Sequence, residues 1–158
     1  RYGKASDPSY DIAEPGFKYN LTDMQAALGI VQLAKIGEIN AKRTRIAKRY
    51  LDGLSNLKGL DLPGIPTYAH VHSWHLFVVK ARSIGRAALM QELAERNIGY
   101  GLHFPACHAL SYVREHLGSV SLPETEAAAE SILSIPLYPS MEDSQIDRVI
   151  LALREICG

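Results

Sequence analysis

The sequence lacks the features that mark secreted, membrane-spanning or nucleic-acid-binding proteins. Its 158 residues include only two cysteines, Cys107 and Cys157, too few for the disulfide framework of a small secreted protein. It has no signal-like segment and no apolar run long enough to cross a bilayer. Charge of either sign is not in excess, because 17 basic residues balance 17 acidic ones. We therefore expect a cytoplasmic protein whose partners include neither nucleic acid nor membrane.

The first expected helix is unusual because it is apolar on nearly every side. Residues 1–15 are polar and turn-rich, which predicts a loop. Thr22 or Asp23 can cap a helix that begins near Met24. Residues 26–34 then show no polar face, and this pattern predicts a helix that is buried all round.

The rest of the chain, with 47% apolar residues overall, predicts helices on a small sheet. Further helices are expected at about residues 38–54, 83–97, 107–117 and 124–133, and a final one opened by a capping box of Ser140 and Asp143. Extended segments are expected at residues 73–80, 98–104 and 135–139, the first of them as a central strand, with an irregular connection at residues 59–69. The expected fold class is α+β.

The polar segment before the first helix groups side chains suited to an anion. Lys18 carries a positive charge, Tyr19 a phenol, and Asn20 an amide that can donate to a phosphate oxygen. The helix start adds unpaired N–H groups and a partial positive charge. Taken alone, however, the pattern fits an ordinary loop with a good helix cap even better than an anion site.

Three histidines lie close together at the start of the expected central strand. In a strand, His70 and His72 share one face and His75 points to the other. Such a group can bind zinc, but the chain has no HExxH pattern and no cysteine pair at ligand spacing. We therefore favour strand histidines with protein hydrogen-bond partners and expect no metal.

Residues 98–104 predict a strand with one nearly bare face. Alternation places one set of residues on that face, Gly99, Gly101 and His103, and another on the opposite face, Tyr100, Leu102 and Phe104. Because the glycines leave space, His103 can donate to a sugar hydroxyl or a phosphate; the alternative is a histidine that caps the next turn. Cys107 beside His108 is not a thiol nucleophile with its base, since neighbours on a helix do not face each other.

A basic cluster lies on the second expected helix and consists of Lys42, Arg43, Arg45, Lys48 and Arg49. A nucleic-acid surface would need a wider basic area or interleaved aromatic residues. We therefore interpret the cluster as a solvated helix face.

Four segments occur in a specific order along the chain. They are residues 16–23 (Gly-Phe-Lys-Tyr-Asn-Leu-Thr-Asp) with residues 25–27, residues 72–77 (His-Ser-Trp-His-Leu-Phe), residues 97–104 (Asn-Ile-Gly-Tyr-Gly-Leu-His-Phe) with His108 and Tyr112, and residues 133–139 (Leu-Ser-Ile-Pro-Leu-Tyr-Pro). Together they resemble the DegT/DnrJ/EryC1/StrS family of pyridoxal-phosphate-dependent sugar aminotransferases. The resemblance covers nearly the whole chain and is closest to the branch that acts on UDP-4-amino-4-deoxy-L-arabinose and oxoglutarate.

The resemblance implies a fold type I aminotransferase that works as a homodimer with shared active sites, using pyridoxal 5'-phosphate, a nucleotide-sugar and glutamate or 2-oxoglutarate. By position, residues Lys18, Tyr19 and Asn20 would contact the cofactor phosphate of the neighbouring subunit. The residues His103, Phe104 and His108 would border the nucleotide-sugar pocket. Many members carry Asn and Arg where this chain has Lys18 and Asn20, so which of the two contacts phosphate stays open.

The family's remaining catalytic groups are expected outside this chain. In the family, the lysine that bonds covalently to the cofactor and the acid that holds its pyridinium nitrogen both lie upstream of the Gly16 motif. Neither Lys4 nor Lys35 sits in the lysine's motif. The resemblance thus implies a C-terminal portion that is inactive alone: residues 1–37 as loop and interface helix, and residues 38–158 as a small domain. The alternative is a non-catalytic interaction or regulatory module that retains this fold.

Overall fold

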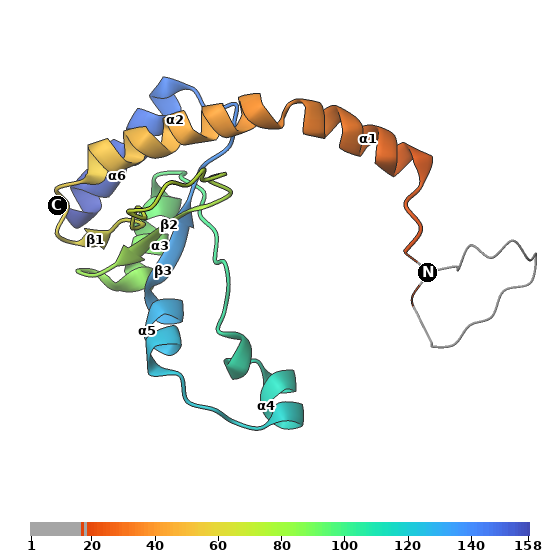
Figure 1. Ribbon diagram of the computed structural model, residues 1–158. Coiled ribbons are helices and arrows are strands. Elements are labelled where there is room, and N and C mark those ends of the chain that lie inside the picture. The colour runs from red at the N-terminus through yellow and green to blue at the C-terminus, as the bar shows by residue number, and fades with distance from the viewer. Residues whose placement is uncertain (1–16, 18) are drawn as a thin grey trace, which may run out of the picture. The chain divides into compact units, whose positions relative to one another are not determined.

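The computed structural model describes residue 17 and residues 19–158, and these divide into two units between Lys35 and Ile36. Lys18 and residues 1–16 lie outside the described residues. Within the described part, α-helices combine with one small antiparallel sheet (Figure 1), so the predicted α+β class is confirmed. No helix in that part of the chain is long and apolar enough to cross a bilayer.

The first unit contains helix α1, Asp23–Ala34, which begins where the sequence predicts. Thr22 is its N-cap, and the capping box is reciprocal: the Gln25 N–H donates to Thr22 Oγ1 at 3.3 Å, and the Thr22 N–H donates to Gln25 Oε1 at 3.0 Å. The predicted burial of α1 is wrong in the described part of the chain. None of its residues is buried, and Leu28 is 66% exposed. A helix that is apolar all round needs protein on every side, and the described residues do not provide it.

The second unit is built on a three-stranded sheet of order β1-β2-β3, with β1 at Leu60–Asp61, β2 at Phe77–Ala81 and β3 at Ile132–Ile135. Both pairings are antiparallel, and Phe77 faces Ile135 in the register of β2 and β3. The expected central strand is therefore confirmed, although it begins at Phe77 and not at Ser73. The connection at residues 59–69 contains the short strand β1, which the sequence pattern did not predict.

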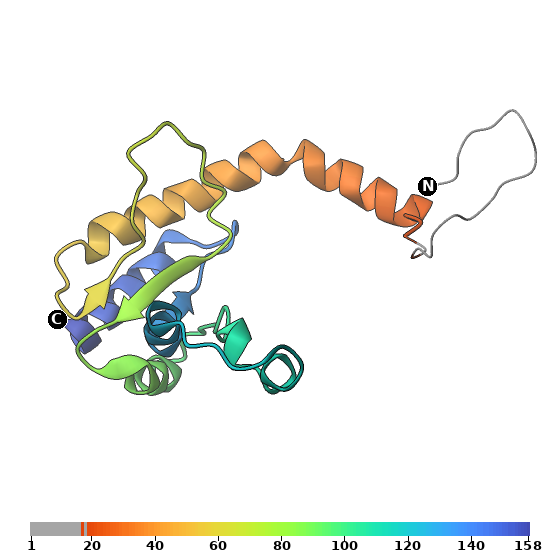
Figure 2. The ribbon, with the colours of Figure 1, turned by 60° about the horizontal axis from the view of Figure 1, so that its bottom comes forward.

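Helices α2 (Ile36–Leu54) and α6 (Asp143–Cys157) pack together and lie side by side in Figures 1 and 2. Helices α3 (Gly85–Glu95) and α5 (Pro123–Ser131) both contact β2. The largest fully buried side chains come from these elements: Ile46, Tyr50, Leu54, Phe77, Val79, Leu89, Leu93, Leu133, Ile146 and Leu153. The predicted apolar stripe of the last helix is confirmed in full, because all four of its members are buried: Ile146, Val149, Ile150 and Leu153.

Two predicted helix starts differ from those in the structure. Helix α6 is capped by Glu142, whose box partner is Gln145, and not by Ser140 with Asp143. Asp143 is already the first helical residue, so its carboxylate cannot complete a box with Ser140. Helix α3 has no side-chain cap, and Ser83 is not its N-cap.

The predicted strand at residues 98–104 is wrong. Its residues form only an isolated antiparallel bridge between Gly101 and Ser134 of β3. Two backbone hydrogen bonds make this bridge, at 2.9 and 2.8 Å. The predicted left-handed residue before it is confirmed, since Asn97 has φ of 53°. The segment is thus attached to the sheet at one point, and that point places His103.

The chain between this segment and α5 carries a 3-10 turn at Cys107–Ala109 and helix α4 at Ser111–Leu117. The sequence predicts a single helix over about these residues. The break falls at Leu110, whose ψ of 139° is extended. Because of this break, His108 belongs to the turn and not to helix α4.

Candidate functional site

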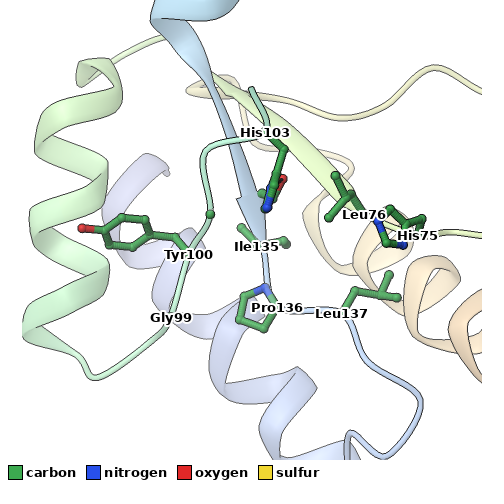
Figure 3. A pocket seen from close by; sticks show the side chains of 10 residues that line it. His75, Leu76, Gly99, Tyr100, His103, Ile135, Pro136 and Leu137 are labelled. Atoms are coloured by element: carbon green, nitrogen blue, oxygen red, sulfur yellow. Dashed lines mark hydrogen bonds between the residues drawn. The ribbon is translucent and has the colours of Figure 1, made fainter. Parts of the chain in front are cut away.

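A cavity of about 300 Å³ lies where three separate segments meet at the end of β3 (Figure 3). Its lining residues are His75, Leu76, Gly99, Tyr100, Gly101, His103, Ser134, Ile135, Pro136 and Leu137. We call it the histidine cavity because two imidazoles line it. The three segments are residues 75–76, residues 99–103, and residues 134–137 at the end of β3. The sequence predicts the last of them only as an extended piece. The sequence thus marks all three segments separately, and the fold brings them together.

His103 is held on two sides. Its Nδ1 lies 2.9 Å from the Oγ of Ser134, and its ring lies directly over Gly101. A Cβ placed on Gly101 would come within 2.3 Å of the His103 Cε1. The expectation that Gly101 leaves room for a ligand is therefore wrong, because the imidazole itself fills that space. Among the described residues, the His103 Nε2 has no hydrogen-bond partner.

The predicted separation of side chains along residues 98–104 holds in part, even without a strand. Gly99, Gly101 and His103 line the histidine cavity, whereas Leu102 and Phe104 do not. Figure 3 shows the Tyr100 side chain turned away from His103 and His75. The cavity is therefore open beside Gly99, where an added Cβ would meet nothing within 4 Å, and its polar lining comes mainly from the two histidines and Ser134.

Phe104 lies between two further cavities. The first, about 320 Å³, is lined by both His103 and Phe104 together with residues of α5. The second, about 470 Å³, is lined by Phe104 and His108. The Phe104 ring is 71% exposed and meets the His103 ring edge-on, with centroids 5.2 Å apart. The three residues predicted to border one pocket thus line a row of adjoining cavities.

His108 is anchored through an acidic side chain. Its Nε2 lies 3.0 Å from Glu126 Oε1, which also accepts the Leu122 N–H at 2.9 Å. These two contacts hold the pKa of the Glu126 carboxyl below its usual range, chiefly through the hydrogen bond from the Leu122 backbone. His108 lies in the 3-10 turn, and the Glu126 carboxylate therefore links this turn to the start of α5.

His75 is a cavity residue that the strand prediction did not identify. The segment before β2 is not extended: Trp74 has φ of 47° and is buried, with its ring stacked on Phe77 at 5.7 Å. The Arg43 Nη1 donates to the carbonyl oxygens of Trp74 and His75, both at 2.9 Å. These contacts fix the turn that brings His75 to the cavity. The His-Ser-Trp-His-Leu-Phe motif was the signal that could have pointed to it.

The prediction that His70 and His72 share one strand face is wrong, because both residues precede β2. The His70 Nδ1–H donates to the Tyr68 carbonyl oxygen at 2.9 Å, and His72 Nδ1 accepts the Trp74 N–H at 2.8 Å. Within residues 17 and 19–158, no three potential ligand side chains are grouped for a metal.

The predicted solvated basic face of α2 holds for Lys42, Arg45 and Lys48, which are exposed, but its three arginines also make specific contacts. Besides Arg43, the Arg45 Nη1 lies 2.5 Å and the Arg49 Nη1 2.9 Å from Oδ1 of Asp143, and Arg49 also pairs with Asp147. The contacts lower the pKa of the Asp143 carboxyl, chiefly through the hydrogen bond from Arg45. The arginines therefore fasten α2 to α6 and to the cavity wall.

The expected cofactor-contacting residues lie in the first unit. Tyr19 and Asn20 are exposed and come just before the N-cap Thr22, while Lys18 falls outside the described residues. An amide at a helix start is a donor set that suits a phosphate. Contact of these residues with a cofactor stays a prediction.

The small antiparallel sheet with helices on it matches part of solved structures of the fold type I transferase class. The family model described as the DegT/DnrJ/EryC1/StrS aminotransferase family matches residues 1–154, and the chain belongs to this family. The family expected from the four motifs is thereby confirmed, and pyridoxal phosphate is the cofactor associated with it.

Several solved structures share the fold. The chain is similar to the aminotransferase TlmJ from Streptoalloteichus hindustanus, with 30% identity over 93% of this chain and 39% of that one, at a TM-score of 0.84. It is similar to DesV of S. venezuelae, with 34% identity over 85% of this chain and 36% of that one, at a TM-score of 0.78. It is also similar to the PLP-form of Spr1654, a putative sugar aminotransferase from Streptococcus pneumoniae, with 26% identity over 99% of this chain and 41% of that one, at a TM-score of 0.86. The chain thus spans about two fifths of the length of these relatives.

Proposed function

We propose that the chain is the small-domain part of a pyridoxal-phosphate-dependent aminotransferase that transfers an amino group from glutamate to a nucleotide-linked keto-sugar. The observation that carries the proposal is the family match over residues 1–154, together with a histidine cavity built from three of the family's motifs. When bound, the cofactor acts as the electron sink for amino transfer. The residues of this chain would bind and orient the cofactor phosphate and the nucleotide-sugar.

The substrate side of the proposal rests on the row of cavities. The His103 Nε2 lacks a partner among the described residues, so it is available to a sugar or phosphate oxygen. The exposed ring of Phe104 offers an apolar face for the sugar or the base. His108 holds the far wall in place through Glu126. We propose that these three residues border the nucleotide-sugar, with the UDP-4-amino-4-deoxy-L-arabinose branch as the first candidate.

The cofactor side rests on the segment before α1. The Asn20 amide and the unpaired N–H groups at the start of α1 are donors that a phosphate accepts from. We propose that Lys18, Tyr19 and Asn20 contact the cofactor phosphate across a homodimer interface. In this arrangement residues 1–37 are the interface segment and residues 38–158 the small domain.

The exposed apolar surface of α1 supports an interface role for the first segment, because Leu28, Ile30 and Leu33 are all more than half exposed. The lysine that bonds to the cofactor is proposed to lie outside this chain. A non-catalytic module is not favoured, since the family and the similar structures are aminotransferases.

The first test follows glutamate and does not depend on the sugar. The full-length protein that contains this chain is incubated with pyridoxal phosphate and glutamate, and 2-oxoglutarate is measured. One equivalent per active site is expected from glutamate alone, and the chain of 158 residues alone should form none. Absence of 2-oxoglutarate with the full-length protein would refute the aminotransferase assignment.

The second test concerns the sugar pocket. UDP-4-amino-4-deoxy-L-arabinose with 2-oxoglutarate should yield glutamate, and His103→Ala should raise the KM for this sugar more than the KM for 2-oxoglutarate. His70→Ala is the matched control, because His70 is exposed and lies outside the three cavities. Equal changes in both KM values would remove His103 from the sugar pocket.

The third test concerns the cofactor segment. Replacing Lys18 and Asn20 together by alanine should weaken retention of pyridoxal phosphate during gel filtration. Lys35→Ala is the control, since Lys35 lies at the opposite end of α1. Unchanged cofactor affinity in the double variant would contradict the phosphate contact.

A further inference from the structure

Ser134 is a polar residue in an otherwise apolar core. Within the described part of the chain it is the one polar or charged residue that is buried, with 5% of its surface exposed. It lies in β3 opposite Val78 of β2, and its backbone forms the bridge to Gly101. A buried hydroxyl costs free energy unless it is hydrogen-bonded. The Ser134 hydroxyl is therefore expected to have a hydrogen-bond partner within the chain.

The partner of the Ser134 hydroxyl is His103. The Oγ lies 2.9 Å from His103 Nδ1, and no other hydrogen bond of this Oγ is present among the described residues. If the proton sat on Nδ1, the ring would donate to Oγ and the hydroxyl hydrogen would have no acceptor among the described residues. If the hydroxyl donates to a bare Nδ1, both groups are satisfied. In the neutral imidazole the proton then sits on Nε2.

The His103 ring also has little freedom to turn. Gly101 lies against the ring atoms Cε1, Nδ1 and Nε2, where even a Cβ would not fit, and Phe104 meets the ring edge-on. The ring lines the histidine cavity and the cavity beside Phe104, and its Nε2 is the nitrogen without a partner in the described part. A fixed ring with a fixed proton presents one defined hydrogen-bonding group to whatever enters.

We propose that Ser134 is a positioning residue that holds His103 in the Nε2–H tautomer, so that the pocket offers a hydrogen-bond donor at this point. The group recognised there is an acceptor: a hydroxyl, carbonyl or phosphate oxygen. The identity of that oxygen as part of the nucleotide-sugar rests on the proposed function. The tautomer itself does not, because it follows from the contacts within the chain.

The direct test is to determine the tautomer of His103 by nitrogen-15 NMR, on full-length protein labelled at histidine and free of ligand. His103→Asn assigns the signal. At a pH where the ring is neutral, Nδ1 should have the shift of an unprotonated nitrogen and Nε2 that of a protonated one. Ser134→Ala should give a mixture of the two tautomers, and Ser134→Thr, which keeps the hydroxyl, should restore the original one.

Ser131→Ala is the matched control. Ser131 lies three residues away, and its hydroxyl donates to carbonyl oxygens of α5, the nearest being Ala127 at 2.7 Å. The tautomer of His103 should be unchanged in this variant. A wild-type ring that carries its proton on Nδ1 would overturn the proposal, and so would a Ser134→Ala ring with the wild-type tautomer. If Ser134→Ala does not fold, the wild-type and Ser134→Thr spectra test the proposal: both should show the proton of His103 on Nε2.

Kinetics separates positioning from mere support of the fold. Ser134→Ala should raise the KM for UDP-4-amino-4-deoxy-L-arabinose by about three- to tenfold, the range of one ordinary hydrogen bond, with the KM for 2-oxoglutarate unchanged. In a His103→Ala background the same change should have no further effect. A full effect in that background would contradict the positioning role. If the protein forms no 2-oxoglutarate from glutamate, the proposed function fails while the NMR result still decides the tautomer.

Discussion

The Tyr50 hydroxyl donates a hydrogen bond to the carbonyl oxygen of Pro136, 2.8 Å away, and so joins the C-terminal part of α2 to the wall of the histidine cavity. Tyr50 is fully buried, and burial raises the pKa of its phenol, which keeps the hydroxyl a donor at any physiological pH. Its ring also packs against Phe77 with centroids 5.1 Å apart. The position of the cavity wall is thus set by a helix that lies on the sheet and not only by β3.

Replacing Tyr50 by phenylalanine tests this link. The change keeps the ring but leaves the partly buried Pro136 carbonyl without its donor, which should lower the free energy of unfolding by about 1 kcal/mol. Urea denaturation measures the loss. Tyr68→Phe is the control, because Tyr68 is exposed, and its effect should stay within about 0.5 kcal/mol. Equal losses in the two variants would show that the hydrogen bond to Pro136 contributes nothing.

Arg43→Gln should loosen the turn that carries His75. The guanidinium donates to two successive carbonyl oxygens, and a glutamine side chain is too short to reach both. Trp74, the single tryptophan of the sequence, lies in this turn and is buried, so its fluorescence reports on the turn directly. Acrylamide quenching of Trp74 should increase in Arg43→Gln. It should not change in Lys42→Gln, since Lys42 pairs with Glu38 on an exposed part of α2.

The elements that the sequence predicts well are those that a local pattern defines completely. The last helix carries its buried residues at helical spacing, and Val149 and Leu153 face the core as expected. The cap at Thr22 depends only on residues three positions apart. Strand β3 was missed because its backbone partner β2 lies more than fifty residues away, and no local signal sets its ends at Ile132 and Ile135.

The candidate site is harder to predict because tertiary contacts override the local pattern. Residues 98–104 alternate like a strand, yet only Gly101 finds a backbone partner. The segment before β2 is rich in strand formers, yet Trp74 turns into the left-handed region, held by stacking and by Arg43. His75 enters the cavity through that turn. The sequence singles out His103 as a candidate, but its contact with Ser134 depends on a bridge that no sequence pattern marks.

The attachment of the His108 turn should depend on pH. Because hydrogen bonds to the Glu126 carboxylate lower its pKa in the folded chain, they stabilise the fold fully above the ordinary Glu pKa of about 4.3. This contribution is lost as pH falls through the lowered pKa. Hydrogen exchange at the Leu122 amide should therefore speed up at low pH, relative to the amides of α5. Glu126→Gln should remove this pH dependence, whereas Glu124→Gln, in the same helical turn, should keep it.

Gly101→Ala should displace His103, because the added Cβ would lie 2.3 Å from Cε1 and 3.0 Å from Nδ1 of the imidazole. The ring would have to leave its place between Gly101 and Ser134, which breaks the 2.9 Å contact with Oγ. The Cε1 proton shift of His103 should change, and the KM for the nucleotide-sugar should rise about as much as in His103→Ala, since the same nitrogen is lost to the pocket. Gly99→Ala is the matched control: a Cβ there meets nothing within 4 Å. A His103 signal that moves equally in both variants would mean that the ring responds to the cavity as a whole and not to the space above Gly101.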